Sequence, residues 1–244
     1  MDTEILGATV RTEIGRPTNL FYGYKTKGVF ATSAEAQAAG LYVRDANGVD
    51  RMAFEAGDVY FVDLDGDHFV TEADRTVIGD PNPDIYGNIF TTVQYERFRL
   101  DVRFNYSLGN DIYNYMRQQL ESGSRFMNQT TALARRWQVE GQQTDIPRLS
   151  FQDPMGNSRF SDRWIEDGSY LRLKTVTLSY DLPISSTFLQ GLQFWVQANN
   201  VFTLSRYLGA DPEGAALSAV LGQGIDAGSV PQSRNFMVGI KISL

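Results

Sequence analysis

The stretch "RFRLDVRFNY", residues 97–106, sorts its side chains with a period of two. Its even-numbered members are all apolar or aromatic: Phe98, Leu100, Val102, Phe104 and Tyr106. Its odd-numbered members are all polar or charged: Arg97, Arg99, Asp101, Arg103 and Asn105. Successive side chains of a β-strand point to opposite faces. The stretch therefore predicts a strand with one apolar face and one charged face.

Five more segments alternate in the same way, at residues 3–14, 86–95, 170–183, 192–202 and 235–244, the first being the weakest. Each is close to the roughly 9–11 residues that a tilted transmembrane strand needs. Long connections at residues 15–84, 109–169 and 208–232 alternate with short ones. Transmembrane β-barrels have short turns at one rim and long loops at the other. We therefore predict an all-β chain with about six antiparallel strands of a transmembrane β-barrel that has long loops at one rim.

The charged side of residues 97–106 distinguishes a barrel from a soluble sheet. Three arginines among five positions fit a water-filled lumen, or contact with a plug, better than ordinary solvent exposure. We predict that Arg97, Arg99, Asp101 and Arg103 face the lumen and that the apolar side faces lipid. The main alternative is a soluble antiparallel sandwich, which also alternates. In that case the chain would be a secreted, calcium-stabilised β-sandwich that binds a ligand or partner.

The bulk composition narrows the classes of function. The 244 residues carry a net charge of -7 with a pI of about 4.8, which argues against nucleic acid as a partner. Cysteine is absent and His68 is the single histidine, which excludes thiolate chemistry and multi-histidine metal sites. No run of about 18 apolar residues exists, so no transmembrane helix is expected.

The stretch "DLDGDHFVTEAD", residues 63–74, has the spacing of an EF-hand-like calcium loop. Acidic side chains stand at positions 1, 3, 5 and 12, and positions 7 and 9 can add a carbonyl and a hydroxyl. The predicted Ca²⁺ ligands are Asp63, Asp65, Asp67, Phe69, Thr71 and Asp74. Position 6 holds His68 where glycine is expected, and histidine tolerates a positive φ better than most residues. The alternative interpretation is a solvated acidic turn.

A second cluster of carboxylates raises the possibility of an enzyme. Asp162, Glu166 and Asp167 surround Trp164 in sequence, and paired carboxylates can hydrolyse glycosides. The structural interpretation is favoured. In it the tryptophan packs the base of a loop, and the carboxylates pair with arginines such as Arg159 and Arg163.

The stretch "SRFSDRWIEDGSYLRLKTVTLSYDLP", residues 158–183, resembles the C-terminal part of SusC/RagA-type TonB-dependent outer-membrane transporters. The stretches "GRPTNLFYGYKTKGVF" at 15–30 and "ANNVFTLSRYLGADPE" at 198–213 agree in order and spacing. The resemblance covers residues 1–244 and implies that they form the C-terminal portion of a large transmembrane β-barrel with long extracellular loops, without the plug or the TonB box. One departure is the turn after residues 86–95. It has Glu96 and Arg97 where the family usually has Gly or Asn, which argues against an ideal two-residue turn.

The resemblance implies import of oligosaccharides or peptides across the outer membrane, with the C-terminus in the periplasm, and no enzymatic activity. The implied partners are the remainder of the transporter chain, a SusD-like surface lipoprotein, TonB and outer-membrane lipid. Aromatic rings stack on sugars and peptides, so rings in the long loops are candidates for substrate contact. They are Tyr113, Tyr115, Phe126, Trp137 and Tyr207.

Six strands do not close a barrel of this kind, since the smallest bacterial barrels have about eight. An open sheet edge in hydrocarbon leaves backbone N–H and C=O groups unpaired. We therefore expect the strands at residues 3–14 and 235–244 to pair with strands outside this chain, which should be stable only within a larger assembly.

Overall fold

The computed structural model of the chain describes residues 1–44, 48, 50–184, 188–214 and 222–244. These residues form two compact units. The strand unit comprises Pro83–Asn110, Asp167–Gly214 and Ser229–Leu244. The loop unit comprises Met1–Asn82, Asp111–Glu166 and residues 222–228. The long connections predicted from the sequence thus supply most of the loop unit. No helix in the described part of the chain is long and apolar enough to cross a membrane.

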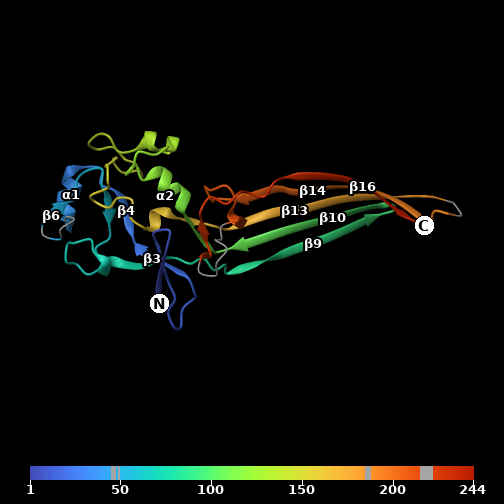
Figure 1. Cartoon of the computed structure of the whole chain (residues 1–244), viewed down its shortest axis with the longest axis horizontal. Coiled ribbons are helices and arrows are strands. Elements are labelled where there is room, and N and C mark those ends of the chain that lie inside the picture. Colours follow the sequence, from blue (N-terminus) through green and yellow to red (C-terminus); the bar gives the residue numbers. More distant parts are fainter. Residues whose placement is uncertain (45–47, 49, 185–187, 215–221) are drawn as a thin grey trace. The chain divides into compact units, whose positions relative to one another are not determined.

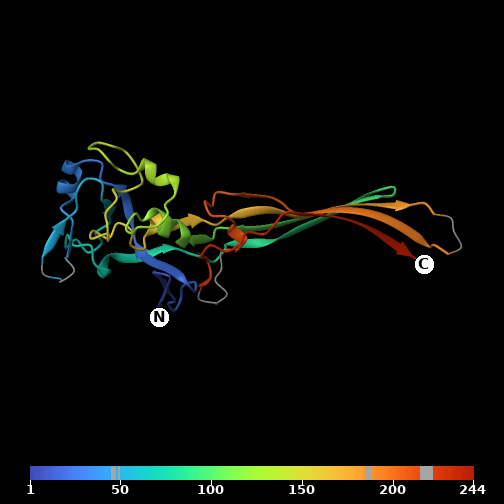
Figure 2. The same ribbon diagram turned by 45° about the horizontal axis from the view of Figure 1, so that its top comes forward.

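The strand unit is one antiparallel sheet in the order β16-β14-β13-β10-β9. Its strands are β9 (Ile85–Tyr95), β10 (Phe98–Leu108), β13 (Tyr170–Leu182), β14 (Gly191–Ser205) and β16 (Asn235–Ser243). Figures 1 and 2 show these strands as a single layer. Five of the six strand segments predicted from the alternating pattern are therefore confirmed.

The register places like residues in rows across this sheet. Directly opposed residues share a face, so each row can be assigned to one side. One row is wholly apolar and runs Val93, Leu100, Leu178, Val196, Val238. The adjacent row, on the opposite face, runs Thr92, Asp101, Thr177, Gln197, Met237. At these two rows the faces read from residues 97–106 therefore continue across all five strands, with Met237 as the one apolar member of the second row.

A β-bulge keeps the two faces separate along the strands. Arg103 lies opposite Thr175 and Phe104 lies opposite Leu173, so Lys174 is the extra residue of β13. Without the bulge, Phe104 would oppose Lys174, and a one-residue slip moves each later side chain to the other face. The bulge thus continues the apolar face to the end of β10.

The turn between β9 and β10 is tighter than its sequence suggests. Tyr95 pairs with Phe98, which leaves Glu96 and Arg97 as a two-residue turn. Glu96 takes the left-handed φ of 50° that such a turn requires and that favours Gly or Asn. The sequence had argued against a two-residue turn here, and the structure shows that the turn forms with Glu96 and Arg97. Arg97 lies in the turn and not in the strand, so strand alternation does not assign it to the polar face.

Residues 3–14 do not form a long strand, so that prediction is wrong. They fold into a hairpin of β1 (Asp2–Ile5) and β2 (Ala8–Arg11). Leu6 and Gly7 have φ values of 50° and 78°, as in the two-residue turns that favour hairpins. The hairpin belongs to the loop unit, in a sheet with β3 (Leu20–Tyr24) and β8 (Arg75–Gly79).

The rest of the loop unit consists of short elements around two apolar cores. Its strands are β4 (Thr26–Val29), β5 (Tyr42–Arg44), β6 (Arg51–Ala53), β7 (Val59–Phe61), β11 (Asp111–Asn114), β12 (Ile165–Asp167, whose last residue falls in the strand unit) and β15 (Ile225–Asp226). Its helices are α1 (Ser33–Ala39) and α2 (Tyr115–Glu121), with 3-10 turns such as η1 (Glu72–Asp74) and η3 (Asp162–Trp164). Fully buried side chains mark the cores, Val59 and Phe61 in one and Tyr113 and Trp164 in the other.

Candidate functional site

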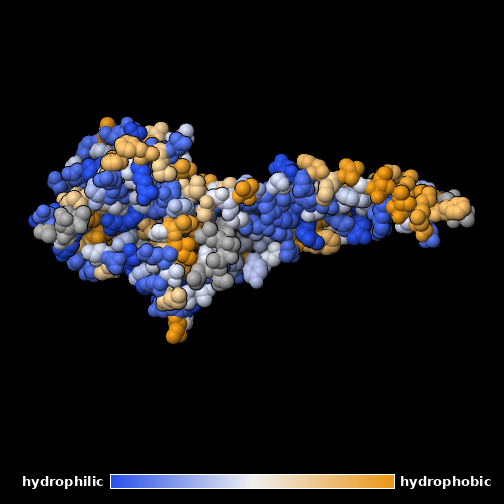
Figure 3. Space-filling view, viewed as in Figure 1, coloured by the Kyte–Doolittle hydropathy of each residue, from blue (hydrophilic) through white to orange (hydrophobic). Residues whose placement is uncertain are grey.

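The apolar face of the strand unit is exposed and continuous. Val93, Val196 and Val238 from one row are 54%, 47% and 79% exposed. Figure 3 shows polar side chains over the middle of the strand unit and apolar ones towards its end at the C-terminus. A soluble sandwich buries its apolar face under a second sheet. Exposure of this face instead fits a surface that meets an apolar medium.

The opposite face carries the charged residues predicted for the lumen. Arg99 pairs with Asp101 at 2.9 Å, and the Thr92 hydroxyl donates to the same carboxylate at 2.5 Å. The Arg103 guanidinium lies 5.7 Å from the centre of the Phe90 ring, which opposes it on β9. Arg99, Asp101 and Arg103 thus share one polar face, and their contact with a lumen stays a prediction.

A buried charge network on this face was missed by the sequence analysis. Arg172 of β13 is only 3% exposed and bonds Asp211 at 2.5 Å and Glu213 at 2.6 Å. Lys174, the bulge residue, reaches Glu213 at 3.0 Å. The network ties residues 211–213 to the sheet. Its charges lie about 40 residues apart in sequence, so no local spacing signals the pairing.

Asp211 is held charged by its surroundings. Burial raises the pKa of Asp211, but the hydrogen bonds from Arg172 and from two backbone N–H groups outweigh burial and leave the pKa below its ordinary value. The two N–H groups belong to Gln232 and Glu213, at 3.0 Å each. One carboxylate therefore joins β13 to two separate stretches of loop.

Three of the predicted calcium ligands converge. Oxygen atoms of Asp63, Asp65 and Asp67 all lie within 4.8 Å of one another. The hydrogen bond from the Asp67 N–H lowers the pKa of Asp65, but partial desolvation and the neighbouring carboxylates leave it above its ordinary value. Crowded negative charge of this kind is what a hard divalent cation offsets. His68 takes a φ of 65°, so it makes the turn that was expected of glycine.

The remaining predicted ligands have other roles in the structure. Asp74 is fully buried, and its two oxygens accept the N–H groups of Leu64 and Thr71 at 2.7 and 2.8 Å. The Thr71 hydroxyl accepts the Ala73 N–H, which completes a capping box at η1. Asp74 is not in the converging group of three, and Phe69 contributes a backbone carbonyl in the prediction. The structure thus brings together the first half of the predicted set.

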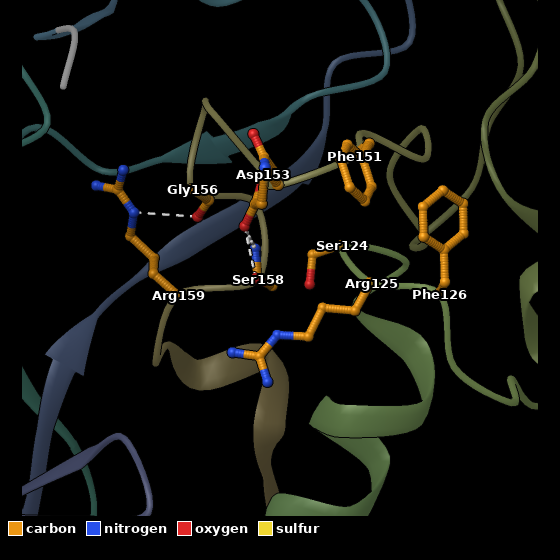
Figure 4. Close-up of a pocket in the computed structure, with 9 residues that line it drawn as sticks. Ser124, Arg125, Phe126, Phe151, Asp153, Gly156, Ser158 and Arg159 are labelled. Carbon is orange, nitrogen blue, oxygen red and sulfur yellow. Dashed lines mark hydrogen bonds between the residues drawn. The ribbon is translucent and has the colours of Figure 1, made fainter.

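The loop unit contains a polar groove beside α2. A cavity of about 620 Å³ is lined by residues of 124–126 and 151–159, and Figure 4 shows them. A second cavity of about 430 Å³ is lined partly by the same three residues, Ser124, Arg125 and Ser158. The two cavities are therefore neighbours that share these three residues, and together they are called the groove. Phe126 lines the first cavity and Tyr115 the second, so two predicted substrate-contacting residues lie in it.

The other predicted aromatic residues are placed elsewhere. Tyr113 is fully buried, with its hydroxyl bonded to Gln118 and to the Leu6 carbonyl. The Trp137 indole N–H donates to the Ala31 carbonyl at 3.1 Å, beside a different cavity of about 330 Å³. Tyr207 is 8% exposed and belongs to the strand unit. The structure does not bring these five side chains into one site.

The carboxylates of the hydrolase alternative have structural partners. Asp162 accepts the Thr26 hydroxyl at 2.7 Å, and Glu166 accepts Arg117 at 2.9 Å. Trp164 is 1% exposed and donates to the Arg159 carbonyl, as the structural interpretation requires. Arg159 and Arg163, however, donate to backbone carbonyls and not to these carboxylates, so the predicted pairing is wrong. Burial, together with the Arg117 charge, lowers the pKa of Arg163 to about 10.

Known proteins similar to this chain are receptors of one kind. TonB-dependent receptor P3 of Formosa agariphila is 32% identical over 236 residues, covering 93% of this chain and 22% of that protein. TonB-dependent receptor P26 of the same organism is 29% identical, covering 98% of this chain and 24% of that protein. No protein-family model matches the chain. The chain thus spans about a quarter of the length of these relatives.

Solved structures with a similar fold belong to the same group of proteins. The RagAB peptide importer in its closed-closed state aligns with 99% of this chain and 24% of its own, at a TM-score of 0.68 and 25% identity. The RagAB peptide transporter aligns with 97% of this chain and 24% of its own, at a TM-score of 0.70 and 24% identity. TonB-dependent receptors are outer-membrane proteins. Sequence and fold therefore identify this chain as a homologue of a segment of SusC/RagA-type TonB-dependent receptors.

Proposed function

We propose that this chain forms barrel wall and extracellular loops of a transporter that imports oligosaccharides or peptides across the outer membrane. The observation that carries the proposal is the two-faced sheet, with an exposed apolar face and a charged opposite face, in a homologue of TonB-dependent receptors. Its partners are the remainder of the receptor, TonB, outer-membrane lipid and a SusD-like surface lipoprotein over the loops. The C-terminus lies in the periplasm.

Each part of the chain has a share in this function. The apolar rows contact lipid tails, as the outward-facing residues of a transmembrane barrel do. The polar rows line the path of a hydrated substrate. The loop unit, with its groove, stands where a substrate and a lid protein would meet. Energy coupling through TonB and the opening of the plug fall to other parts of the receptor. Catalysis is not part of the proposal, because the carboxylates of residues 162 and 166 have structural partners.

Deletion and uptake measurements test the transport function. Bacteria that lack the whole receptor should lose uptake of one class of oligomer, either oligosaccharide or peptide, and regain it with the restored gene. The receptor purified in mild detergent should carry a surface lipoprotein with it. Unchanged uptake of both classes by the deletion strain would refute the proposal. The secreted sandwich alternative predicts no heat-modifiable migration on a gel, whereas a barrel shows it.

We also propose that residues 63–74 bind Ca²⁺, on the convergence of Asp63, Asp65 and Asp67. A divalent cation would offset their mutual repulsion and fix the loop, and Phe69 would add its carbonyl. Thr71 and Asp74 would join only if the capping box at η1 opened.

Calcium binding is measured by protection of the loop from proteolysis in the whole receptor. Protection should rise with Ca²⁺ and fall with a chelator. Asp65→Asn should abolish the response, while Glu72→Gln, an exposed carboxylate nearby, should keep it. Equal cleavage with Ca²⁺ and with chelator would contradict the site.

A further inference from the structure

The groove of the loop unit contains three charged side chains, and two of them are held in place. Arg159 donates to the carbonyls of Gly156 and Met155 at 3.0 and 3.1 Å, with its guanidinium 5.0 Å from the ring centres of Tyr24 and Phe61. Asp153 accepts the Asn157 and Ser158 N–H groups at 2.7 Å each. Figure 4 shows Arg159 directed towards Gly156 and Asp153 directed towards Ser158.

Arg125 is the third charged residue and is not held. Within the described part of the chain its guanidinium makes no hydrogen bond and no ion pair, and the residue is exposed. Asp153 lines the same cavity yet pairs with the backbone and Ser158 instead. Since the Asp153 charge offsets that of Arg159, one net positive charge remains in the groove, and it lies on Arg125.

Two exposed rings stand beside Arg125. Phe126 is 92% exposed and Phe151 is 57% exposed, although their ring centres are only 4.8 Å apart. Burying such rings against a ligand is favourable, and their faces pack on flat apolar surfaces. Figure 4 shows both rings at the side of the cavity away from Arg159. The two rings and the Arg125 side chain thus line the same cavity, with the guanidinium directed away from the rings (Figure 4).

The second cavity extends the groove with uncharged polar groups. Gln119, Ser122 and Tyr115 line it, and Arg125 and Ser124 line both cavities. Amide and hydroxyl groups both donate and accept hydrogen bonds, which suits the neutral polar units of an oligomer. The groove therefore offers two aromatic rings, one arginine without a partner among the described residues, and a polar extension.

We propose that this groove binds an oligomer through a carboxylate, with Arg125 as the residue that selects for it. A guanidinium matches a carboxylate in charge and in its paired donors. The single net positive charge suits a singly charged carboxylate, and a phosphate would carry nearly twice that charge. A uronic acid and an acidic amino acid both supply this group. The inference rests on the proposed import function and adds the class of substrate.

The experiment uses the whole receptor with its bound partners and four probes. These are trigalacturonate and its full methyl ester, and a triglutamate peptide and its side-chain amide, both peptides with acetylated N-termini and amidated C-termini so that the amide form carries no carboxylate. Binding is measured by calorimetry, and uptake by cells is measured with the same probes. For at least one pair, the acid form should bind tenfold or more tightly than the neutral form, because a hydrogen bond to a charged group is lost in the neutral one.

Three variants separate the parts of the site. Arg125→Gln should remove the discrimination between acid and neutral forms. Phe126→Ala should weaken both forms and keep the ratio. Arg16→Gln serves as control, since Arg16 is an exposed arginine of the loop unit with only a 3.7 Å pair to Glu13.

The outcomes separate this inference from the import function. Equal affinity for acid and neutral forms overturns the inference, and so does discrimination that survives Arg125→Gln. In either case, uptake of neutral oligomers would still support the import function. Absence of uptake and binding for every oligosaccharide and peptide tried overturns both. Discrimination in the uronate pair alone, or in the peptide pair alone, supports the inference and identifies the source of the carboxylate.

Discussion

At the scale of single residues, Asp211 controls how the loop at 211–213 is attached to the sheet. Its carboxylate bonds Arg172 and the N–H groups of Glu213 and Gln232. Asp211→Asn should lower the free energy of local opening by about 1.5–3 kcal/mol, because bonds between charged groups are the strong ones. Amide hydrogen exchange at residues 213 and 232 of the whole receptor measures this, with Glu13→Gln as an exposed control.

The same carboxylate makes the attachment depend on pH. Its pKa is lowered from the ordinary 3.8, so its stabilising effect is complete above pH 3.8 and is lost as the pH falls through the lower folded value. Protection of the two amides should therefore hold at neutral pH and disappear in acid below pH 3.8. In Asp211→Asn the protection should no longer show this dependence. A variant with unchanged exchange at every pH would contradict the role given to Asp211.

Residue-scale chemistry was only partly predictable from the sequence. Asp63, Asp65 and Asp67 are two positions apart on one turning loop, so local spacing was enough to bring them together. Asp74 was also placed by spacing, yet the capping box at η1 takes its oxygens. Arg172 and Asp211 are brought together by the sheet and a long loop, and no local pattern encodes such a contact. Arg125 was missed for the same reason, since its groove is built from two separate stretches.

At the scale of the element, β16 depends on a glycine. Gly239 lies opposite Trp195 on β14, and a Cβ on Gly239 would come within 2.3 Å of the indole ring. Gly239→Ala should therefore destabilise the barrel by roughly 1–3 kcal/mol through overpacking. Gly191→Ala is the matched control, because there the nearest atom is at 3.7 Å. The measurement is the temperature at which the receptor loses its folded band on a gel. An equal temperature for the two variants would contradict the packing argument.

The apolar rows permit a sharper element-scale prediction. Val102 shares its face with Thr91 and Val176, and its neighbours along β10 on that face are Leu100 and Phe104. If that face meets lipid, Val102→Arg near the midplane should cost about 2–4 kcal/mol in folding free energy.

Thr177→Arg is the matched control, because residue 177 lies opposite Asp101 on the polar face. Refolding of the receptor into lipid vesicles, followed by denaturant titration, measures both. A larger cost for the Thr177 variant would mean that the two faces are assigned the wrong way round.

The elements themselves were largely predictable, and the exceptions have local causes. A period of two in the sequence predicts both a strand and the two faces of that strand. This is why the sequence predicted β9, β10, β13, β14 and β16. The failure at residues 3–14 came from the turn at Leu6 and Gly7, which divides a plausible alternation into a hairpin. The sequence also gave no sign of the bulge at Lys174. Only pairing with β10 shows which residue is extra.

At the scale of the whole molecule, the open edges of the sheet carry the last prediction. Among the described strands β9 pairs only with β10, and β16 pairs only with β14. The outer edges of the sheet are therefore β9 and β16. The sequence had predicted residues 3–14, and not β9, as the first edge strand. In hydrocarbon each unpaired N–H and C=O costs several kcal/mol. Both edges should be paired with strands from the remainder of the receptor, which closes the sheet.

Residues 1–244 expressed alone in the presence of lipid vesicles should therefore aggregate or stay outside the bilayer. The same residues refolded together with the remainder of the receptor should yield a protease-resistant, heat-modifiable species. Exposed strands with apolar rows, such as β9 and β16, associate edge to edge when no partner strand covers them. A soluble, monomeric chain that unfolds cooperatively would contradict both the open edges and the lipid-facing rows. Those two properties stem from one pattern, because the alternation that sends apolar side chains to lipid also forces every backbone group to find its partner in a neighbouring strand.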